Sequence, residues 1–257
     1  MLKRIAAAFV LAALAPCTRA LAEGQMVSYP SGSETVKGYL ASPSGASASA
    51  ASASSGKKPA LVVIHEWWGL NDWTKKKADE FAQKGYVALA PDLYRGKVTS
   101  DPDVAHQLMR GMPDDRALRD MKAAVTYLKS RPDVDASKIG AVGWCMGGGL
   151  ALDLAVAEPT LAGAVIYYGH LMTEPATIAS LKVPLLGNFG GKDQGIPPES
   201  VREFEAAARK AGKSVDFKIY PEAGHGFASL ANPRPVDAKD ADARTDAFFA
   251  KTLKGKG

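Results

Sequence analysis

From Pro59 onward, short apolar runs alternate with longer segments in which apolar residues recur every three or four positions. The runs predict strands buried on both faces, and the longer segments predict amphipathic helices. The expected strands are Ala60–His65, Tyr86–Ala90, Ile139–Val142, Gly163–Tyr168, Val183–Phe189 and Val215–Ile219. The expected helices are Asp72–Lys84, Val104–Met109, Asp114–Arg131, Met146–Ala157, Pro198–Ala211 and Asp237–Leu253. This alternation predicts an α/β fold with a mainly parallel central sheet and helices on both faces.

The segments outside this alternation are of three kinds. Residues 23–40 alternate loosely around Ser31-Gly32-Ser33, which predicts an edge hairpin. Residues 41–58 are rich in Ala, Ser and Gly, so they bury little apolar surface and are expected to form a mobile loop. Asp133–Ser137 is expected to be the turn that follows a helix. Because no repeat and no boundary between two cores is visible, residues 23–257 are predicted to form a single domain.

The first 22 residues read as a secretory signal peptide. Lys3 and Arg4 precede an apolar run over 5–15, and Ala20-Leu21-Ala22 is a typical cleavage site. The alternatives are a transmembrane anchor, for which the run is too short, and a lipoprotein site at Cys17. Cleavage after Ala22 would give an exported chain, periplasmic or secreted, without stable membrane insertion.

Charge and cysteine content change this picture only slightly. The 257 residues carry a formal net charge of +5, but three basic residues and no acidic one fall in residues 1–22, which leaves +2 for the remainder. That balance gives no case for a nucleic-acid partner. Of the two cysteines, Cys17 would leave with the signal peptide. Cys145 would then be a lone thiol in an oxidising compartment, where it must be buried or used.

Cys145 stands in the pentapeptide Gly143-Trp144-Cys145-Met146-Gly147, between an expected strand and an expected helix. This pattern is typical of the nucleophile elbow of α/β-hydrolases, in which a strained turn presents the nucleophile. Glycines two residues to either side avoid steric collisions, and the helix N-terminus favours a thiolate. The alternative is a buried apolar cysteine in a strand beside a glycine-rich turn.

A cysteine nucleophile needs a base, and the base needs an orienting carboxylate. Asp193 follows the expected strand Val183–Phe189, and His225 follows Val215–Ile219. In a parallel sheet such loops share one edge, and the order nucleophile, acid, histidine is that of α/β-hydrolases. Individually, Asp193 could be a turn former and His225 a capping or core residue. Together with Cys145 they predict a catalytic triad.

Two further features belong to the same edge. The backbone N–H of Met146, which follows the nucleophile, and that of Trp67, in the loop after strand Ala60–His65, are the expected oxyanion hole. Glu66 places a carboxylate beside two tryptophans at the end of an apolar strand. It is either a functional group or a solvated acid near the start of a helix.

Six segments spread over residues 26–253 resemble the dienelactone hydrolase family. They are His65-Glu66-Trp67-Trp68-Gly69, Pro91-Asp92-Leu93-Tyr94, Gly143-Trp144-Cys145-Met146-Gly147-Gly148, Tyr168-Gly169, Gly191-Lys192-Asp193 and Ala223-Gly224-His225-Gly226-Phe227. The resemblance implies the α/β-hydrolase fold and a triad of Cys145, His225 and Asp193. It also implies that Glu66 contacts the resting thiol and swings away when substrate binds, which would protect the thiol from oxidation.

The chain departs from the family at the substrate's carboxylate. Members that act on dienelactone hold this group with two arginines, whose positions here fall at Ser229 and near residues 104–106, where no arginine stands. Arg95, Arg110 or His106 could substitute, although each could equally be a solvated charge. Tyr94 and Arg95 are retained as candidate substrate contacts. The departure argues against dienelactone itself, but not against some other ester, lactone or thioester.

No cofactor or metal is expected. His65, His106 and His170 lack a close metal-type spacing, and no dinucleotide-type glycine pattern follows a strand. The leading hypothesis is an exported hydrolase that cleaves a small-molecule ester or lactone through an acyl-enzyme. The alternatives are a non-catalytic binding protein on a hydrolase scaffold and a redox-active thiol protein. The triad argues against the first, and the lack of a resolving cysteine argues against the second.

Overall fold

A computed structural model describes residues 24–43, 56–229 and 233–255. The predicted signal peptide and most of the low-complexity stretch 41–58 lie outside these residues. The strands form a single eight-stranded sheet in the order β1-β2-β4-β3-β5-β6-β7-β8. They are β1 (Gln25–Ser31), β2 (Glu34–Ala41), β3 (Lys58–Ile64), β4 (Val87–Pro91), β5 (Val134–Trp144), β6 (Gly163–Tyr167), β7 (Leu185–Gly190) and β8 (Val215–Tyr220).

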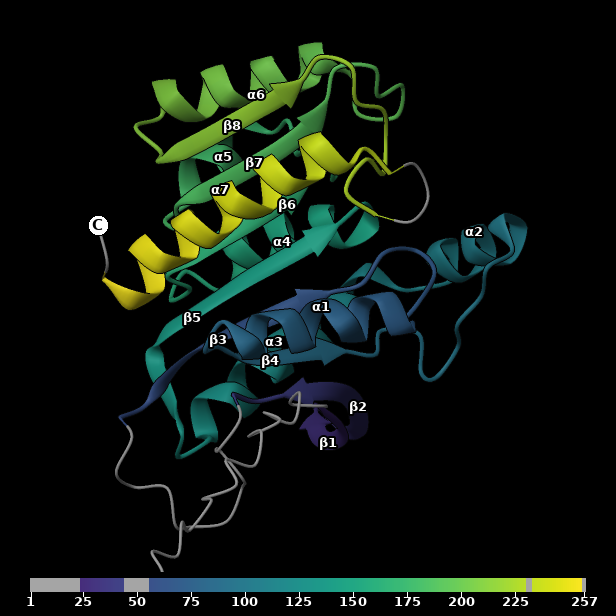
Figure 1. The fold of residues 1–257 in the computed structure, drawn as a ribbon, viewed down its shortest axis with the longest axis vertical. Coiled ribbons are helices and arrows are strands. Elements are labelled where there is room, and N and C mark those ends of the chain that lie inside the picture. Colours follow the sequence, from purple (N-terminus) through teal and green to yellow (C-terminus); the bar gives the residue numbers. More distant parts are fainter. Residues whose placement is uncertain (1–23, 44–55, 230–232, 256–257) are drawn as a thin grey trace, which may run out of the picture.

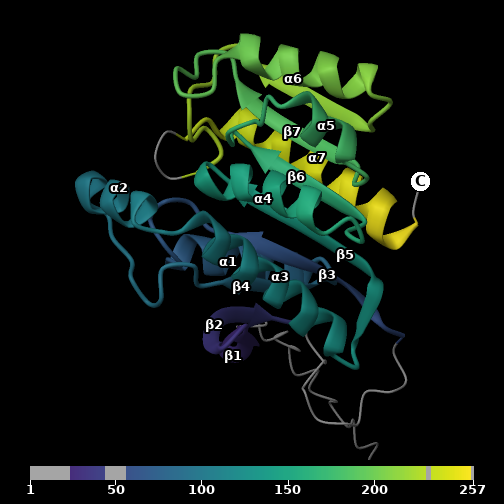
Figure 2. The ribbon, with the colours of Figure 1, turned by 180° about the vertical axis from the view of Figure 1, so that it is seen from behind.

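The strands from β3 to β8 pair in parallel, and only the hairpin β1–β2, which joins β4, is antiparallel. The helices are α1 (Asp72–Gln83), α2 (Pro102–Arg110), α3 (Asp114–Ser130), α4 (Met146–Ala157), α5 (Pro175–Ser180), α6 (Pro198–Lys210) and α7 (Pro235–Lys254). Helices α1 and α7 cover one face (Figure 1), and α3, α4 and α6 cover the other (Figure 2). The predicted α/β fold is therefore confirmed, including the edge hairpin.

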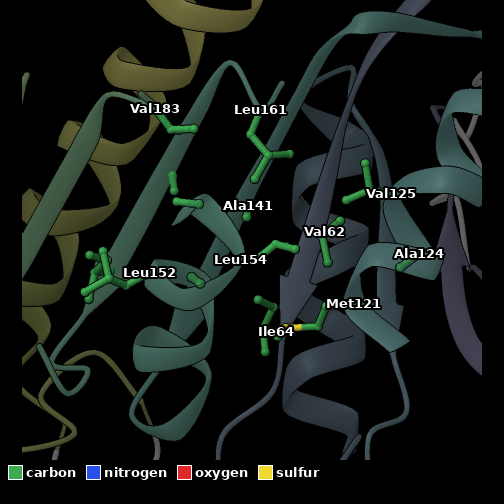
Figure 3. Close-up of a cluster of buried hydrophobic side chains, with 14 of the residues drawn as sticks. Val62, Ile64, Met121, Ala124, Val125, Ala141, Leu152, Leu154, Leu161 and Val183 are labelled. Carbon is green, nitrogen blue, oxygen red and sulfur yellow. The ribbon is translucent and has the colours of Figure 1, made fainter. Parts of the chain in front are cut away.

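Burial on both faces explains why the central strands are apolar throughout. In β3, Val62 and Ile64 pack into one cluster and Leu61 and Val63 into another on the opposite face. Figure 3 shows the first cluster, where residues of α3 and α4 meet those of the sheet. Since each layer removes a strand face from water, a polar side chain inside these strands needs a hydrogen-bond partner, as Asn188 of β7 has in Arg244.

Three sequence-based expectations need correction. Asp133–Ser137 was expected to be a turn, but β5 already begins at Val134, which pairs with Lys58. The turn chemistry is nevertheless present, because the Ser137 N–H and hydroxyl both donate to Asp135 within an irregular stretch of the strand pairing. The short helix α5 was not predicted. The ends of the expected loop 41–58 also belong to strands, since residue 41 closes β2 and residue 58 opens β3.

All parallel strands end at the same edge of the sheet, at the right in Figure 1. The loops after β3, β4 and β8 lie there, and α2 lies beyond the ends of β3 and β4. This arrangement brings together side chains that are far apart in sequence. Within the described ranges, none of the helices is long and apolar enough to cross a membrane.

Candidate active site

Cys145 occupies the single-residue turn between β5 and α4. Its backbone has φ 55° and ψ −120°, a conformation that residues with a Cβ rarely adopt. The turn is held by hydrogen bonds on both sides: the Cys145 N–H donates to the carbonyl of Tyr167, and its carbonyl accepts from Gly148. The thiol is thereby fixed at the N-terminus of α4, partly exposed to solvent.

Two glycines allow this turn, through close contacts between backbone segments. A Cβ on Gly143 would lie 1.9 Å from the carbonyl oxygen of Gly147. A Cβ on Gly147 would lie 2.4 Å from the carbonyl oxygen of Ile64, at the end of β3. The glycines are therefore needed because the backbone at Gly143 lies close to that at Gly147, and the backbone at Gly147 lies close to the end of β3.

His225 and Asp193 meet at the same edge. The Nδ1–H of His225 donates to Oδ2 of Asp193 at 2.8 Å, and the N–H groups of Gly195 and Ile196 each donate to Oδ1 at 2.9 Å. Burial would raise the pKa of Asp193, but these hydrogen bonds outweigh it and hold the pKa below its usual value. The carboxylate therefore stays ionised and fixes the orientation of the imidazole.

The other side of the His225 ring faces the thiol. Burial alone would lower the pKa of His225, but hydrogen bonds to Asp193 and Cys145 raise it to about 10. The ring of Tyr168 packs edge-on against the imidazole, with centroids 5.1 Å apart. Three side chains from three loops thus form the continuous chain Cys145–His225–Asp193.

The two expected oxyanion-hole groups follow two neighbouring strands of the sheet, β5 and β3. Met146 is the first residue of α4, and Trp67 lies in the loop after β3. Across the described part of the chain, neither backbone N–H donates a hydrogen bond to a protein acceptor. Both donors are therefore free for an oxygen of a bound substrate.

Glu66 is almost completely buried, with 6% of its surface exposed. Burial raises the pKa of its carboxyl to about 7, although a hydrogen bond to Ser229 and the charge of His225 oppose the shift. The hydrogen-bond partner given by the structure is therefore Ser229, whereas the family resemblance implied a contact with the resting thiol. The carboxyl lies close enough to His225 for the two charges to interact.

His65, the residue before Glu66, is neutral and forms hydrogen bonds with the backbone of the loop after β3. Its Nδ1–H donates to the carbonyl of Glu66 at 2.6 Å, and its Nε2 accepts from the N–H of Leu93 at 3.3 Å. Burial lowers the pKa of His65, consistent with two backbone partners and no charge. The ring therefore ties the loop after β3 to the loop after β4.

The two candidate substrate contacts have different surroundings. The Tyr94 hydroxyl lies 3.2 Å from Sδ of Met146. Its pKa is raised, mainly by burial and to a smaller extent by the charge of the nearby Cys145. Arg95 pairs with Asp120 at 2.7 Å and with Glu34 at 2.8 Å, so two carboxylates of the protein balance its charge. Arg95 therefore ties its loop to the β1–β2 hairpin and to α3.

Two residues of the site were not predicted as such. Ser229 was noted only as the place of a missing arginine, yet it binds the carboxyl of Glu66. Tyr168 packs on His225 from the end of β6, and its φ of 36° is positive, as is the φ of 55° at Cys145. Its position at the carboxyl end of a strand could have indicated this role. Over the described ranges, no group of three or more His, Cys, Asp or Glu side chains is arranged to hold a metal ion.

The model of one family, the dienelactone hydrolases, matches residues 44–253. The chain belongs to the dienelactone hydrolase family. A Methylorubrum extorquens protein provisionally named carboxymethylenebutenolidase is 33% identical over 213 residues, covering 77% of this chain and 73% of the relative. Protein usf of Aquifex pyrophilus is 33% identical over 90% of this chain and 99% of its own length.

A solved structure from Klebsiella pneumoniae, provisionally described as a dienelactone hydrolase, superimposes with a TM-score of 0.79. It is 30% identical and covers 89% of this chain and 98% of its own. The chain is therefore a hydrolase with the α/β-hydrolase fold of this family, and a small molecule is its substrate.

Proposed function

We propose that this dienelactone hydrolase family member cleaves an ester or lactone through a thioester acyl-enzyme on Cys145. The single observation that carries the proposal is the continuous chain from the thiol through His225 to the ionised, buried Asp193. A binding protein would have no need of a thiol and an imidazole aligned by a carboxylate.

The geometry supports the following sequence of steps. Cys145 transfers its thiol proton to His225, and the thiolate attacks the substrate carbonyl. The resulting oxyanion accepts hydrogen bonds from the N–H groups of Met146 and Trp67. His225 donates its proton to the departing alkoxide and then accepts one from a water molecule. That water attacks the thioester carbon, and collapse of the second tetrahedral intermediate releases the carboxylic acid and restores the thiolate. Asp193 holds the imidazole in the required orientation throughout.

Hydrolysis of p-nitrophenyl acetate, followed by trapping of the intermediate, tests this proposal. Cys145→Ala should lower kcat by at least about a thousandfold, because triad residues act as a unit. Mixing wild type with the ester and quenching with acid should give an acetylated peptide that contains Cys145 in a mass spectrum. Undiminished turnover by Cys145→Ala would show that the assignment is wrong. Binding of esters by wild type without turnover would instead favour a binding protein.

We further propose that the chain is exported. The support is the N-terminal sequence pattern, with a cleavage site before Glu23. Gly24, the first described residue, donates its N–H to the Tyr39 hydroxyl at 2.8 Å and to Asp79 at 3.1 Å. The proposed cleavage therefore leaves Gly24 and the whole of β1 (Gln25–Ser31) in the mature chain.

A further inference from the structure

A cavity of about 680 Å³ lies between the loop after β4, helix α2 and the start of α3. Its walls include Tyr94, Lys97, Val98, Val104, Leu108 and Arg116. Among the described residues that line it there is no aspartate or glutamate. The cavity is therefore a basic one, located beyond the carboxyl ends of the strands.

Two of its cations are not neutralised by the protein. Arg116 donates to the carbonyl of Leu93 at 3.3 Å, while its Nε is buried and has no hydrogen-bond partner. In the part of the chain that the structure describes, neither Arg116 nor Lys97 forms an ion pair, in contrast to Arg95 beside them. A buried guanidinium N–H without an acceptor is unfavourable, so this position favours an anionic ligand.

The same cavity exposes apolar side chains. Val98 is 52% exposed and Val104 is 40% exposed, and both are among the few large hydrophobic residues of the described chain that are open to solvent. Exposed apolar surface beside unpaired cations is suited to a ligand with an apolar body and a negative end. A simple inorganic anion would leave the two valines uncovered.

The cavity is connected to the active site through Tyr94. This residue forms part of the cavity wall, and its hydroxyl contacts Met146, next to the nucleophile. A ligand in the cavity would therefore lie one side chain away from Cys145.

We propose that this cavity binds the carboxylate of an amphiphilic organic acid, held by Arg116 and Lys97, with its hydrocarbon part on Val98, Val104 and Leu108. The carboxylate can belong to a substrate that carries an acid group remote from its ester, or to a free acid. The first source rests on the proposed esterase activity, and the second does not.

Calorimetric titration of the protein with hexanoate tests the site without using activity. Arg116→Gln and Lys97→Gln should each weaken binding by roughly tenfold, as expected for loss of a hydrogen bond between charged groups. Lys122→Gln is the matched control, because it removes a positive charge from an exposed position of α3 outside the cavity. Hexanol at the same concentration controls for apolar binding alone. Circular dichroism establishes that each variant is folded. If Arg116→Gln does not fold, Lys97→Gln still tests the site, because Lys97 is exposed and its replacement does not disturb packing.

Ester hydrolysis then identifies the source of the carboxylate. If the substrate supplies it, wild type should prefer the mono-p-nitrophenyl ester of adipic acid over p-nitrophenyl hexanoate in kcat/KM, and Arg116→Gln should lose this preference. If a free acid supplies it, hexanoate binding should depend on Arg116 while the two esters are affected equally. Either result supports the site.

Hexanoate that binds equally to wild type, Arg116→Gln and Lys97→Gln, or that does not bind to wild type, would overturn the inference. Failure of the proposed activity gives a different result: neither ester would be turned over, while the calorimetric titration would still decide whether the cavity binds an acid.

Discussion

Glu66 illustrates how burial at one residue makes the stability of the protein depend on pH. Its carboxyl has a pKa of about 7 in the folded chain, above the value of about 4.5 for the free group. The folded state therefore binds this proton more tightly than the unfolded state does. The resulting stabilisation is complete below pH 4.5 and is lost as pH rises through 7.

Replacing this carboxyl by an amide removes the titration. Glu66→Gln should gain stability relative to wild type as pH rises from 5 to 8, by up to roughly 3 kcal/mol, since one pKa unit corresponds to about 1.4 kcal/mol. Urea unfolding at the two pH values measures the difference. Glu203→Gln, which changes a residue on the exposed side of α6, is the control and should show no such trend. A constant difference between Glu66→Gln and wild type would contradict the buried-acid interpretation.

Asp193 provides a second prediction for a single residue. Its hydrogen bond is the largest contribution that raises the pKa of His225 against burial, so Asp193→Asn should lower that pKa from about 10. Titration of the His225 ring by NMR measures the shift. Activity should fall by roughly 10⁴-fold, because the amide can stabilise the wrong tautomer. Asp72→Asn, at an exposed carboxylate, should change neither the titration nor the activity. An unshifted His225 would show that Asp193 does not control it.

At the scale of elements, the elbow depends on how closely α4 approaches β3. Gly147→Ala would place a Cβ 2.4 Å from a backbone carbonyl of β3, which cannot move without disturbing the sheet. The variant should lose at least about 3 kcal/mol of unfolding free energy, or fail to fold, as an overpacked core does. Thermal unfolding measures this loss.

Gly56→Ala is the matched control for the elbow. A Cβ at Gly56 meets nothing within 4 Å, so this variant should unfold within about 0.5 kcal/mol of wild type. If the two alanine variants were equally stable, the close approach of α4 to β3 would not be a determinant of the fold.

The elements also show what sequence patterns can and cannot predict. The start of α4 at Met146 is predicted from the motif. The glycine-flanked turn ends there, and the spacing of the apolar residues changes there from that of a strand to that of a helix. The short α5 escapes prediction, since six residues contain too few turns to show a helical period. The start of β5 is missed because Asp135 and Ser137 are residues typical of a turn, and the Ser137 N–H does donate to Asp135. The strand begins there because Val134 pairs with Lys58, a contact between distant parts of the chain that the local sequence does not show.

At the scale of the whole molecule, the parallel sheet brings residues that follow different strands together at one edge. Cys145, Asp193 and His225 lie far apart in the chain, yet each follows a strand and therefore reaches the same edge. Sequence order could predict that convergence. It could not predict that Ser229 binds Glu66 or that Arg116 is left without a carboxylate, because those depend on side-chain contacts between loops. Loop contacts of this kind have no periodicity.

Export is a prediction about the whole chain. Expression in a Gram-negative host with the full sequence should give a mature protein in the periplasmic fraction whose N-terminal residue is Glu23. Intact-mass measurement and N-terminal sequencing check both points, and a chain with Ala20 and Ala22 both changed to Gln, which destroys the cleavage pattern, is the control. A cytoplasmic protein that retains residues 1–22 would show that the segment is not a signal peptide.

The backbone of Cys145, with φ 55° and ψ −120°, has one further consequence. Glycine tolerates these angles, whereas any residue with a Cβ is strained there by roughly 1–3 kcal/mol. Cys145→Gly should therefore have a higher melting temperature than Cys145→Ala, and also a higher one than wild type. Under the function proposed above, a substitution that relieves this strain would raise the melting temperature and abolish turnover together.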